Sequence, residues 1–241
     1  INLASCRSGE YEGLQKKLDD KNWKPDFGPN KYNDSIKRSG ATAISARDFL
    51  VAYNINLNTT STRKANAVAF DIREAGRIKR EGGVITGKII KDKNGNPQRT
   101  PGLFKSVKGI GWFIEEYGIA QISYNLTDIN VSPLHEVFDK TCEQATKRGL
   151  RVTGSELVGL VPKKVLIDAG EYFLKKQKRS LGVSEKEIIK IAIKSLGLDE
   201  ISSFDVNERI IEYMIEEKKQ KKLIDLSLKD FVLETSSESP A

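Results

Sequence analysis

The spacing of apolar residues changes abruptly between residues 49 and 77, and that change limits the folds open to this chain. Across 49–57 apolar side chains alternate with smaller or polar ones, a period of two that predicts a strand. Across 61–77 they recur at helical spacing, which predicts a helix with one buried stripe. The stripe consists of Ala65, Val68, Ala69, Ile72 and Ala75.

Two further strands are expected between residues 106 and 127. The segments 106–115 and 119–127 are rich in strand-forming residues, and a tight turn at 116–118 makes them antiparallel neighbours. Ahead of them, Asn94 followed by Gly95 is typical of a hairpin tip because both residues tolerate a left-handed backbone. A separate hairpin is therefore expected before the two strands.

A second helix and a fourth strand complete the pattern. Ser132 is expected to cap a helix that has Pro133 at its first position and stops at Gly149. Its apolar stripe is Leu134, Val137, Phe138, Cys142 and Ala145. Residues 151–160 then predict the last strand. The order strand, helix, strand, strand, helix, strand predicts an α+β fold: a ferredoxin-like split βαβ antiparallel sheet with helices on one face.

The two ends of the chain differ from this central region. Residues 1–40 are rich in Gly, Pro, Asn, Asp and Lys, so we expect a short helix near 10–18 and then a long loop. Everything after Pro162 has helical character and predicts a helical extension.

Three helix starts are expected in the extension. Ser184, with a glutamate three residues later, has the pattern of a capping box, and Gly197 is expected to end that helix. Asp205 begins another helix, and Ser227 begins the last.

The composition of the 241 residues favours a globular protein. Hydrophobic residues make up 38%, enough for a core, while no apolar run is long enough to span a bilayer. The two cysteines, Cys6 and Cys142, lie far apart and lack neighbours at metal-ligand spacing, so no metal site and a reducing cytoplasmic setting are expected. The net charge of +7 is compatible with nucleic acid, a membrane surface or a polyanionic metabolite.

The face of the predicted sheet that helices leave open carries neutral hydrogen-bonding side chains. If the apolar rows pack on the helices, the opposite rows bring together Asn54, Asn56, Gln121, Ser123, Asn125, Thr153 and Ser155. Such groups suit an uncharged heteroaromatic ring with many donors and acceptors. Alternatively, they only keep an open face in contact with water.

A basic nucleic-acid-binding module on a ferredoxin-like sheet is the alternative function. Residues 108–114 follow part of an RNA-recognition strand, but Ile110 and Glu116 stand where stacking aromatics are required, and the segment is the second strand, not the third. Its glycines more readily allow close backbone approach, and Trp112 and Phe113 are typical of core or subunit contacts.

The single histidine, His135, is the only histidine candidate for a catalytic base. The positive end of the predicted helix would favour a neutral ring, as a base requires. Its apolar neighbours favour a structural role in packing instead.

Several segments closely resemble the glutamate formimidoyltransferase family, in the family's order and over nearly the whole chain. One of them is 23–29, which contains an Asp-Phe-Gly-Pro motif at 26–29. The others are 7–14, 40–43, 49–57, 110–112, 120–123, 125–128, 154–162 and 208–213.

The resemblance implies an enzyme domain built of two similar subdomains with folate in a tunnel between them. This chain looks like the C-terminal subdomain of that domain in bifunctional formimidoyltransferase-cyclodeaminases. The implied reaction of histidine degradation converts 5-formimidoyltetrahydrofolate and L-glutamate into tetrahydrofolate and N-formimidoyl-L-glutamate. Tetrahydrofolate, including its polyglutamylated forms, is therefore expected as substrate or product, and no metal is implied.

The resemblance also supplies candidate folate-binding residues. The family's folate-binding loop follows the Asp-Phe-Gly-Pro motif and ends at the next glycine, which spans 28–40 here, and an expansion at 83–100 resembles bacterial members. With the open-face residues, the expected folate contacts are Gly28, Pro29, Asn30, Lys31, Tyr32, Ser39, Gly40, Asn54, Asn56 and Asn125.

No catalytic residue is assigned within this chain. The family's base is a histidine of the first subdomain, to which His135 does not correspond, so this chain by itself is expected to be inactive. Its expected partners are folate, L-glutamate, the missing N-terminal subdomain and the cyclodeaminase domain of the same polypeptide. A homo-oligomer is expected for the full protein, with neither nucleic acid nor membrane as a partner.

The expected domain organisation has four parts, and both ends are expected to be truncations of a longer protein. Residues 1–40 would form the entry segment and folate-binding loop, and 41–160 the formimidoyltransferase C-terminal subdomain. A helical extension and linker would follow at 161–226. Residues 227–241 would be the truncated start of the cyclodeaminase domain.

Overall fold

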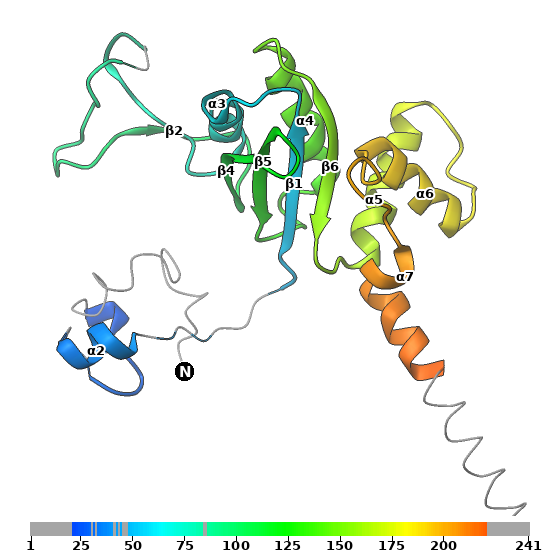
Figure 1. Cartoon of the computed structure of the whole chain (residues 1–241), viewed down its shortest axis with the longest axis horizontal. Coiled ribbons are helices and arrows are strands. Elements are labelled where there is room, and N and C mark those ends of the chain that lie inside the picture. The colour runs from blue at the N-terminus through cyan, green and yellow to red at the C-terminus, as the bar shows by residue number, and fades with distance from the viewer. Residues whose placement is uncertain are drawn as a thin grey trace, which may run out of the picture. The chain divides into compact units, whose positions relative to one another are not determined.

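The computed structural model describes residues 21–29, 31, 33–40, 42, 44, 48–83 and 86–220. The chain divides into two compact units, Ile1–Asp48 and Phe49–Ala241 (Figure 1). The helices predicted near residue 10 and from Ser227 lie outside the described residues.

The second unit contains the predicted ferredoxin-like arrangement. Its four strands are β1 (Val51–Leu57), β4 (Val107–Ile114), β5 (Ile119–Leu126) and β6 (Val152–Val158). They form one antiparallel sheet in the order β4-β5-β1-β6. Between them in the chain come α3 (Thr62–Ile72) and α4 (Leu134–Thr146). The predicted α+β fold class is confirmed.

One face of the sheet forms the core with these two helices. In β1 the alternate residues are Val51, Tyr53, Ile55 and Leu57, and all four are buried as the two-residue period predicts. Burying a large apolar side chain of this kind stabilises the fold by about 1.5–3 kcal/mol. The hydroxyl of Tyr124 in β5 lies 3.1 Å from that of Thr141 in α4, which places α4 on this same face.

Gly111 lets α3 lie directly against edge strand β4. A Cβ at Gly111 would come within 2.4 Å of the Asn66 backbone nitrogen. The Asn66 side chain accepts a hydrogen bond from the Gly111 N–H at 3.0 Å and donates one to the Gly111 carbonyl at 2.8 Å. The expected close approach at a glycine of this strand is confirmed, and it occurs on the helix-covered face.

Helix α3 is shorter than its apolar stripe suggested. It ends at Ile72, because Arg73 adopts an extended backbone and Gly76 then donates to the Arg73 carbonyl in a turn. Ala75 therefore lies past the helix and is exposed, so its assignment to the buried stripe was wrong.

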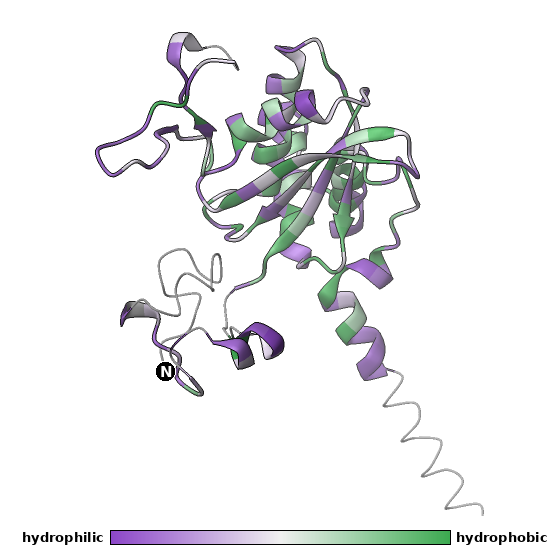
Figure 2. Ribbon diagram, turned by 60° about the vertical axis from the view of Figure 1, so that its left-hand side comes forward, coloured by the Kyte–Doolittle hydropathy of each residue, from purple (hydrophilic) through white to green (hydrophobic). Residues whose placement is uncertain are grey.

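Residues 77–100 form an extension that we call the arm. It contains β2 (Arg77–Ile78), η3 (Glu81–Gly83) and β3 (Arg99–Thr100), and much of it is hydrophilic (Figure 2). The predicted hairpin tip is confirmed: Gly95 donates to the Asp92 carbonyl at 3.1 Å, and the flanking segments are joined by a bond from Gln98 to Ile90.

The start of α4 differs from the prediction by one residue. Pro133 occupies the cap position and Leu134 begins the helix. The Ser132 hydroxyl donates to the Lys105 carbonyl at 2.5 Å instead of capping the helix. The predicted cap was wrong because a backbone acceptor outside the helix binds this hydroxyl.

The helical extension is confirmed in the part of the chain that the structure describes. It contains α5 (Lys163–Lys176), α6 (Glu185–Leu196), α7 (Val206–Arg209) and a helical stretch at 211–220. Ser184 caps α6 by accepting from the Glu187 N–H at 3.3 Å, and Gly197 ends it. None of the described helices is long and apolar enough to cross a bilayer.

The described part of the first unit holds two short helices, η2 (Lys21–Trp23) and α2 (Asp34–Ser39). The expectation of a long loop after the first helix was wrong for the stretches 21–23 and 34–39, which are helical. Asn33 caps α2 by accepting from the Ile36 N–H at 3.0 Å, and the Gly40 N–H donates to the Ile36 carbonyl. The side-chain cap satisfies an amide that a helix end leaves free.

Candidate functional site

The strand register gathers the predicted polar residues on the face opposite α3 and α4. Asn54 pairs with Ser123, Asn56 pairs with Gln121, and Asn125 stands opposite Ala52. Directly paired residues of antiparallel strands point to the same side of the sheet. Because the alternate residues of β1 and β5 enter the core, these five polar side chains lie on the other face, as predicted.

A hydrogen-bonded network occupies the middle of this face. The Asn56 amide donates to the carboxylate of Glu200 at 2.6 Å. The Gln121 amide in turn donates to the Asn56 carbonyl oxygen at 2.7 Å. Asn56 and Gln121 are fully buried. The three side chains come from β1, β5 and the segment after α6, so the network links the sheet to the helical extension.

Glu200 reaches the network because the residue of β6 that its side chain crosses is a glycine, Gly154. A Cβ at Gly154 would lie 2.5 Å from the Cβ of Glu200. Gly154 pairs with Asn56 across β1 and β6, so the carboxylate arrives beside that amide. Glu200 was not among the predicted functional residues, because its contact with Asn56 joins positions 144 residues apart.

The network fixes the orientation of its two amides. A carboxylate only accepts, so the NH₂ group of Asn56 must face Glu200 and its oxygen must face Gln121. The NH₂ group of Gln121 is then used by Asn56. Its oxygen, Oε1, is buried and has no hydrogen-bond partner among the described residues. A buried acceptor without a donor is costly, and the full burial of Gln121 keeps this atom out of reach of a ligand in this arrangement.

The rest of the face offers further contacts. Asn54 donates to Glu156 at 3.2 Å, whereas Asn125 is exposed. On edge strand β4, Trp112 stands opposite Gln121 and keeps 44% of its surface exposed. An exposed indole beside hydrogen-bonding groups can stack on a flat ring.

Two other predicted members of this face lie differently. Ser155 is on the helix-covered side: its oxygen accepts from the Tyr53 hydroxyl at 2.8 Å, and its own hydroxyl donates to the Leu196 carbonyl at 2.7 Å. Its assignment to the open face was therefore wrong. Thr153 is exposed at an irregularity of the β1–β6 pairing.

The predicted loop residues belong to the first unit. Gly28, Pro29, Lys31 and Ser39 are exposed, and Gly40 ends α2. The Ser39 hydroxyl donates to the Ser35 carbonyl at 3.0 Å. Asn30 and Tyr32 lie outside the described residues. Whether these residues bind folate stays a prediction.

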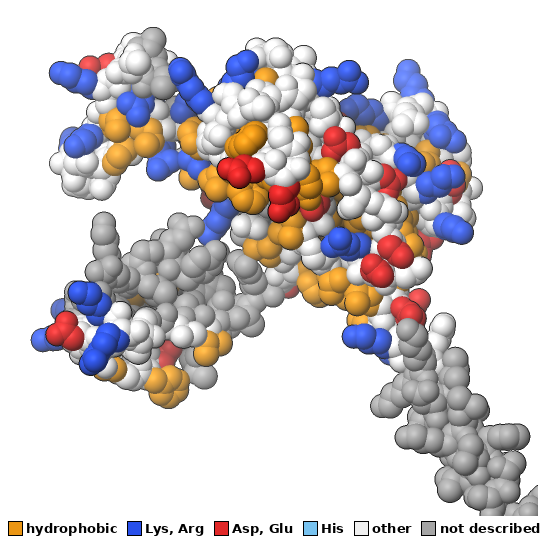
Figure 3. All heavy atoms as spheres, in the orientation of Figure 1, with side chains coloured by type: hydrophobic (Ala, Val, Ile, Leu, Met, Phe, Trp, Pro, Cys, Tyr) orange, Lys and Arg blue, Asp and Glu red, His pale blue; other side chains and the backbone are white. Residues whose placement is uncertain are grey.

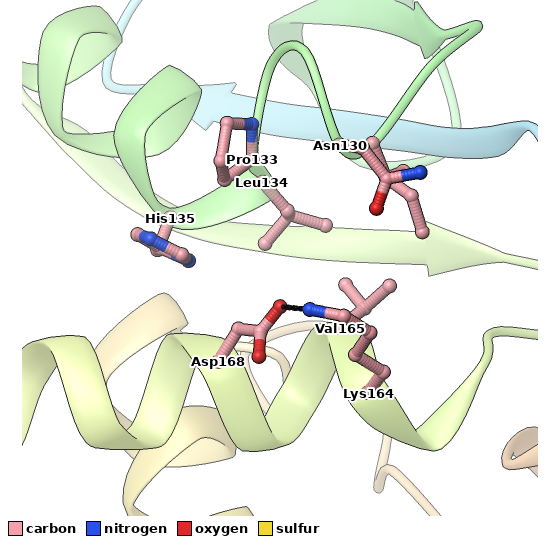
Figure 4. Close-up of a pocket in the computed structure, with 8 residues that line it drawn as sticks. Asn130, Pro133, Leu134, His135, Lys164, Val165 and Asp168 are labelled. Carbon is pink, nitrogen blue, oxygen red and sulfur yellow. Dashed lines mark hydrogen bonds and ion pairs between the residues drawn. The ribbon is translucent and has the colours of Figure 1, made fainter.

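His135 has the structural environment that its apolar neighbours indicated. Its ring lies 4.5 Å from that of Tyr172, measured between centroids, at the edge of a small cavity between α4 and α5 (Figure 4). Burial lowers the pKa of His135, which keeps the ring neutral. Nδ1 is buried without a hydrogen-bond partner among the described residues. The cavity measures about 10 Å³, close to the space for one water molecule.

Cys142 and the possible metal ligands provide no reactive group in the described part of the chain. Burial raises the pKa of Cys142 to about 11, so its thiol stays protonated at neutral pH. Within the described ranges no cluster of His, Cys, Asp or Glu is arranged to hold a metal ion.

Comparison with protein-family models shows which family the chain belongs to. Residues 52–216 match the Formiminotransferase domain, and residues 1–47 match the Formiminotransferase domain, N-terminal subdomain. The chain belongs to the formiminotransferase family. The prediction that it represents the C-terminal subdomain alone is not confirmed, because its first 47 residues match the N-terminal subdomain.

The similar proteins have two names, formimidoyltransferase-cyclodeaminase and glutamate formimidoyltransferase. The formimidoyltransferase-cyclodeaminase of Gallus gallus is 42% identical over 240 residues, which cover 99% of this chain and 40% of that protein. The protein of the same name from Dictyostelium discoideum is 39% identical over 241 residues. The glutamate formimidoyltransferase of Streptococcus pyogenes is 35% identical over 173 residues, or 72% of this chain and 48% of that protein. The chain thus spans about two-fifths of the bifunctional formiminotransferase relatives it matches.

Proposed function

We propose that this chain provides the folate-binding side of a glutamate formimidoyltransferase that acts in histidine degradation. The observation that carries the proposal is the row of neutral hydrogen-bonding side chains on the open face, in a chain of the formiminotransferase family. The names of the relatives supply the transfer of a formimidoyl group and glutamate as a substrate. Tetrahydrofolate, as the other carrier of that group, is what the family resemblance implies.

The reaction moves a formimidoyl group between two nitrogens. The amino group of glutamate attacks the formimidoyl carbon on N5 of tetrahydrofolate, and a tetrahedral intermediate forms. The bond from that carbon to N5 then breaks, N5 receives a proton, and the attacking nitrogen loses one. The site must therefore hold the pterin ring in place and move protons between two nitrogens.

The open face is suited to the first of these tasks. Asn125 would add a contact at the accessible part of the face, and Trp112 would stack on the ring.

The second task requires a proton-transferring base, and no histidine lies on the described part of the open face. His135 is the only histidine of the chain, and its ring packs against Tyr172 on the helix-covered side of the sheet. We therefore propose that the base comes from another part of the full protein. The purified chain should show no turnover above background with 5-formimidoyltetrahydrofolate and glutamate.

Calorimetric titration with 5-formyltetrahydrofolate, a stable analogue of the substrate, tests the binding role. Asn125→Ala should weaken binding about two- to tenfold, because one hydrogen bond is worth about 0.5–1.5 kcal/mol. Asn207→Ala removes an exposed amide in α7 and serves as the matched control. Equal affinity of the Asn125→Ala variant and the unchanged chain would remove this residue from the site, and no binding by the unchanged chain would refute the proposal.

A further inference from the structure

A cleft of about 490 Å³ lies between α3 and the arm, away from the proposed folate face. Helix α3 contributes Arg63, Phe70 and neighbouring residues, and the arm contributes Arg77, Lys79 and Arg80. The volume falls in the range of small-molecule sites. Because α3 packs on the face of the sheet opposite Asn56, this cleft is separate from the network around Glu200.

The walls of the cleft are strongly basic. Five cationic side chains line it: Arg63, Arg73, Arg77, Lys79 and Arg80. Among the described residues, no acidic side chain lines it. Figure 3 shows blue Lys and Arg side chains around a group of orange apolar ones over the arm. Such a concentration of one charge sign favours an anionic ligand.

Only part of this charge is neutralised from within the protein. Asp71 forms ion pairs with Arg77 and with Arg148. Arg63 and Lys79 are exposed at the rim and have no ion-pair partner in the described ranges. A ligand would therefore meet two cations that no carboxylate of the described chain already binds.

The inner guanidinium groups are fixed in place by backbone carbonyls. Arg73 donates to the carbonyls of Gly76 and Gly109 at 3.2 and 3.0 Å, and its guanidinium lies 4.0 Å above the ring of Phe70. Arg80 donates to the carbonyl of Gly87 at 2.9 Å. A guanidinium has five donors, so each group keeps donors for a ligand while its orientation is held. Burial lowers the pKa of Arg73, and the nearby charge of Arg99 adds to the effect, as expected where positive charge accumulates.

Apolar side chains separate the cationic groups. Phe70, Ile78 and Ile90 line the cleft and are partly buried. They would exclude water from the flat or apolar body of a ligand while the arginines bind its charged end. A simple inorganic ion would leave the apolar part of this surface unused.

We propose that this cleft binds a small organic molecule with two or more negatively charged oxyanion groups on an aromatic or apolar body. Arginine binds phosphate and carboxylate oxygens in the same two-pronged way, so either group meets the requirement. The site lies outside the folate face and does not depend on the transferase reaction.

Titration calorimetry on the 241-residue chain tests this proposal. The probes are adenosine diphosphate, which carries phosphates on an aromatic body, and benzene-1,3,5-tricarboxylate, which carries carboxylates. Inorganic phosphate supplies the oxyanion without the aromatic body, and adenosine supplies the aromatic body without the phosphates. A single-stranded oligonucleotide represents a nucleic acid. The test variant is Arg63→Gln with Lys79→Gln. The control, Lys91→Gln with Lys93→Gln, removes the same charge at the tip of the arm.

We expect saturable binding of adenosine diphosphate, of the tricarboxylate or of both, and the responding probe identifies the oxyanion. The test variant should bind at least about tenfold more weakly, because two charge-assisted contacts are lost, and the control should bind unchanged. Thermal unfolding of both variants verifies that they are folded. The proposal would be overturned if neither probe binds, or if phosphate or adenosine alone binds equally tightly. Binding of the oligonucleotide only, or unchanged affinity in the folded test variant, would also overturn it.

Discussion

The carboxylate of Glu200 accepts a hydrogen bond from the side-chain amide of Asn56 at 2.6 Å, across 144 positions of the sequence. This bond sets the direction of the next one, from Gln121 to Asn56, and so leaves the buried acceptor oxygen of Gln121 without a partner among the described residues. A residue of the helical extension thereby determines which way the side-chain amides of Asn56 and Gln121 are oriented on the sheet.

Removing this acceptor should destabilise the fold. Glu200→Ala leaves the buried Asn56 amide unpaired, which should lower the free energy of unfolding by about 1–3 kcal/mol. Glu200→Gln keeps an acceptor oxygen and should cost less than the alanine variant. Urea denaturation measures both, with Glu208→Ala as a control at an exposed acidic position of α7. Equal stability of the alanine variant and the unchanged chain would show that the network is not formed.

The contact between α3 and β4 should tolerate no side chain at position 111. Gly111→Ala places a Cβ within 2.4 Å of the Asn66 backbone, and the resulting strain should cost about 1–3 kcal/mol. The lower entropy of the unfolded alanine chain returns only about 0.4–1 kcal/mol. Gly182→Ala is the matched control, because its Cβ would meet only Ser180 Oγ at 3.4 Å. A Gly111→Ala variant as stable as the control in urea denaturation would contradict the packing described.

The neutral state of His135 should make part of the stability dependent on pH. Burial lowers its folded pKa below the ordinary value of 6.5, so the unfolded chain binds more protons between those two pKa values. This contribution is complete above about pH 6.5 and is lost as the pH falls toward the folded pKa. Urea denaturation at a series of pH values should show a larger loss of stability for the unchanged chain than for His135→Gln. Parallel curves would mean that the ring is not held neutral.

The sequence predicted the fold well where apolar periodicity decides which way a residue points. In β1 the large apolar side chains occupy only every second position, so the positions of Asn54 and Asn56 on the opposite face could be predicted directly. In β6, apolar side chains occupy both odd and even positions (Val152, Leu157 and Val158), so the sequence does not show which side faces the core. The prediction for Ser155 was wrong for that reason. The role of Glu200 could not be predicted, because it depends on where the chain passes after α6 and not on any local period.

The two tryptophans allow a direct test of where folate binds. Trp112 stands on the open face beside Gln121, and Trp23 belongs to the first unit. The tryptophan fluorescence of the chain is followed during titration with 5-formyltetrahydrofolate, corrected for ligand absorbance, in the unchanged chain and in the Trp23→Phe and Trp112→Phe variants. If folate binds the open face, the unchanged chain and Trp23→Phe will show the same saturable quenching of Trp112, and Trp112→Phe will lose that component. A Trp23→Phe variant whose remaining fluorescence does not respond to folate would contradict this location.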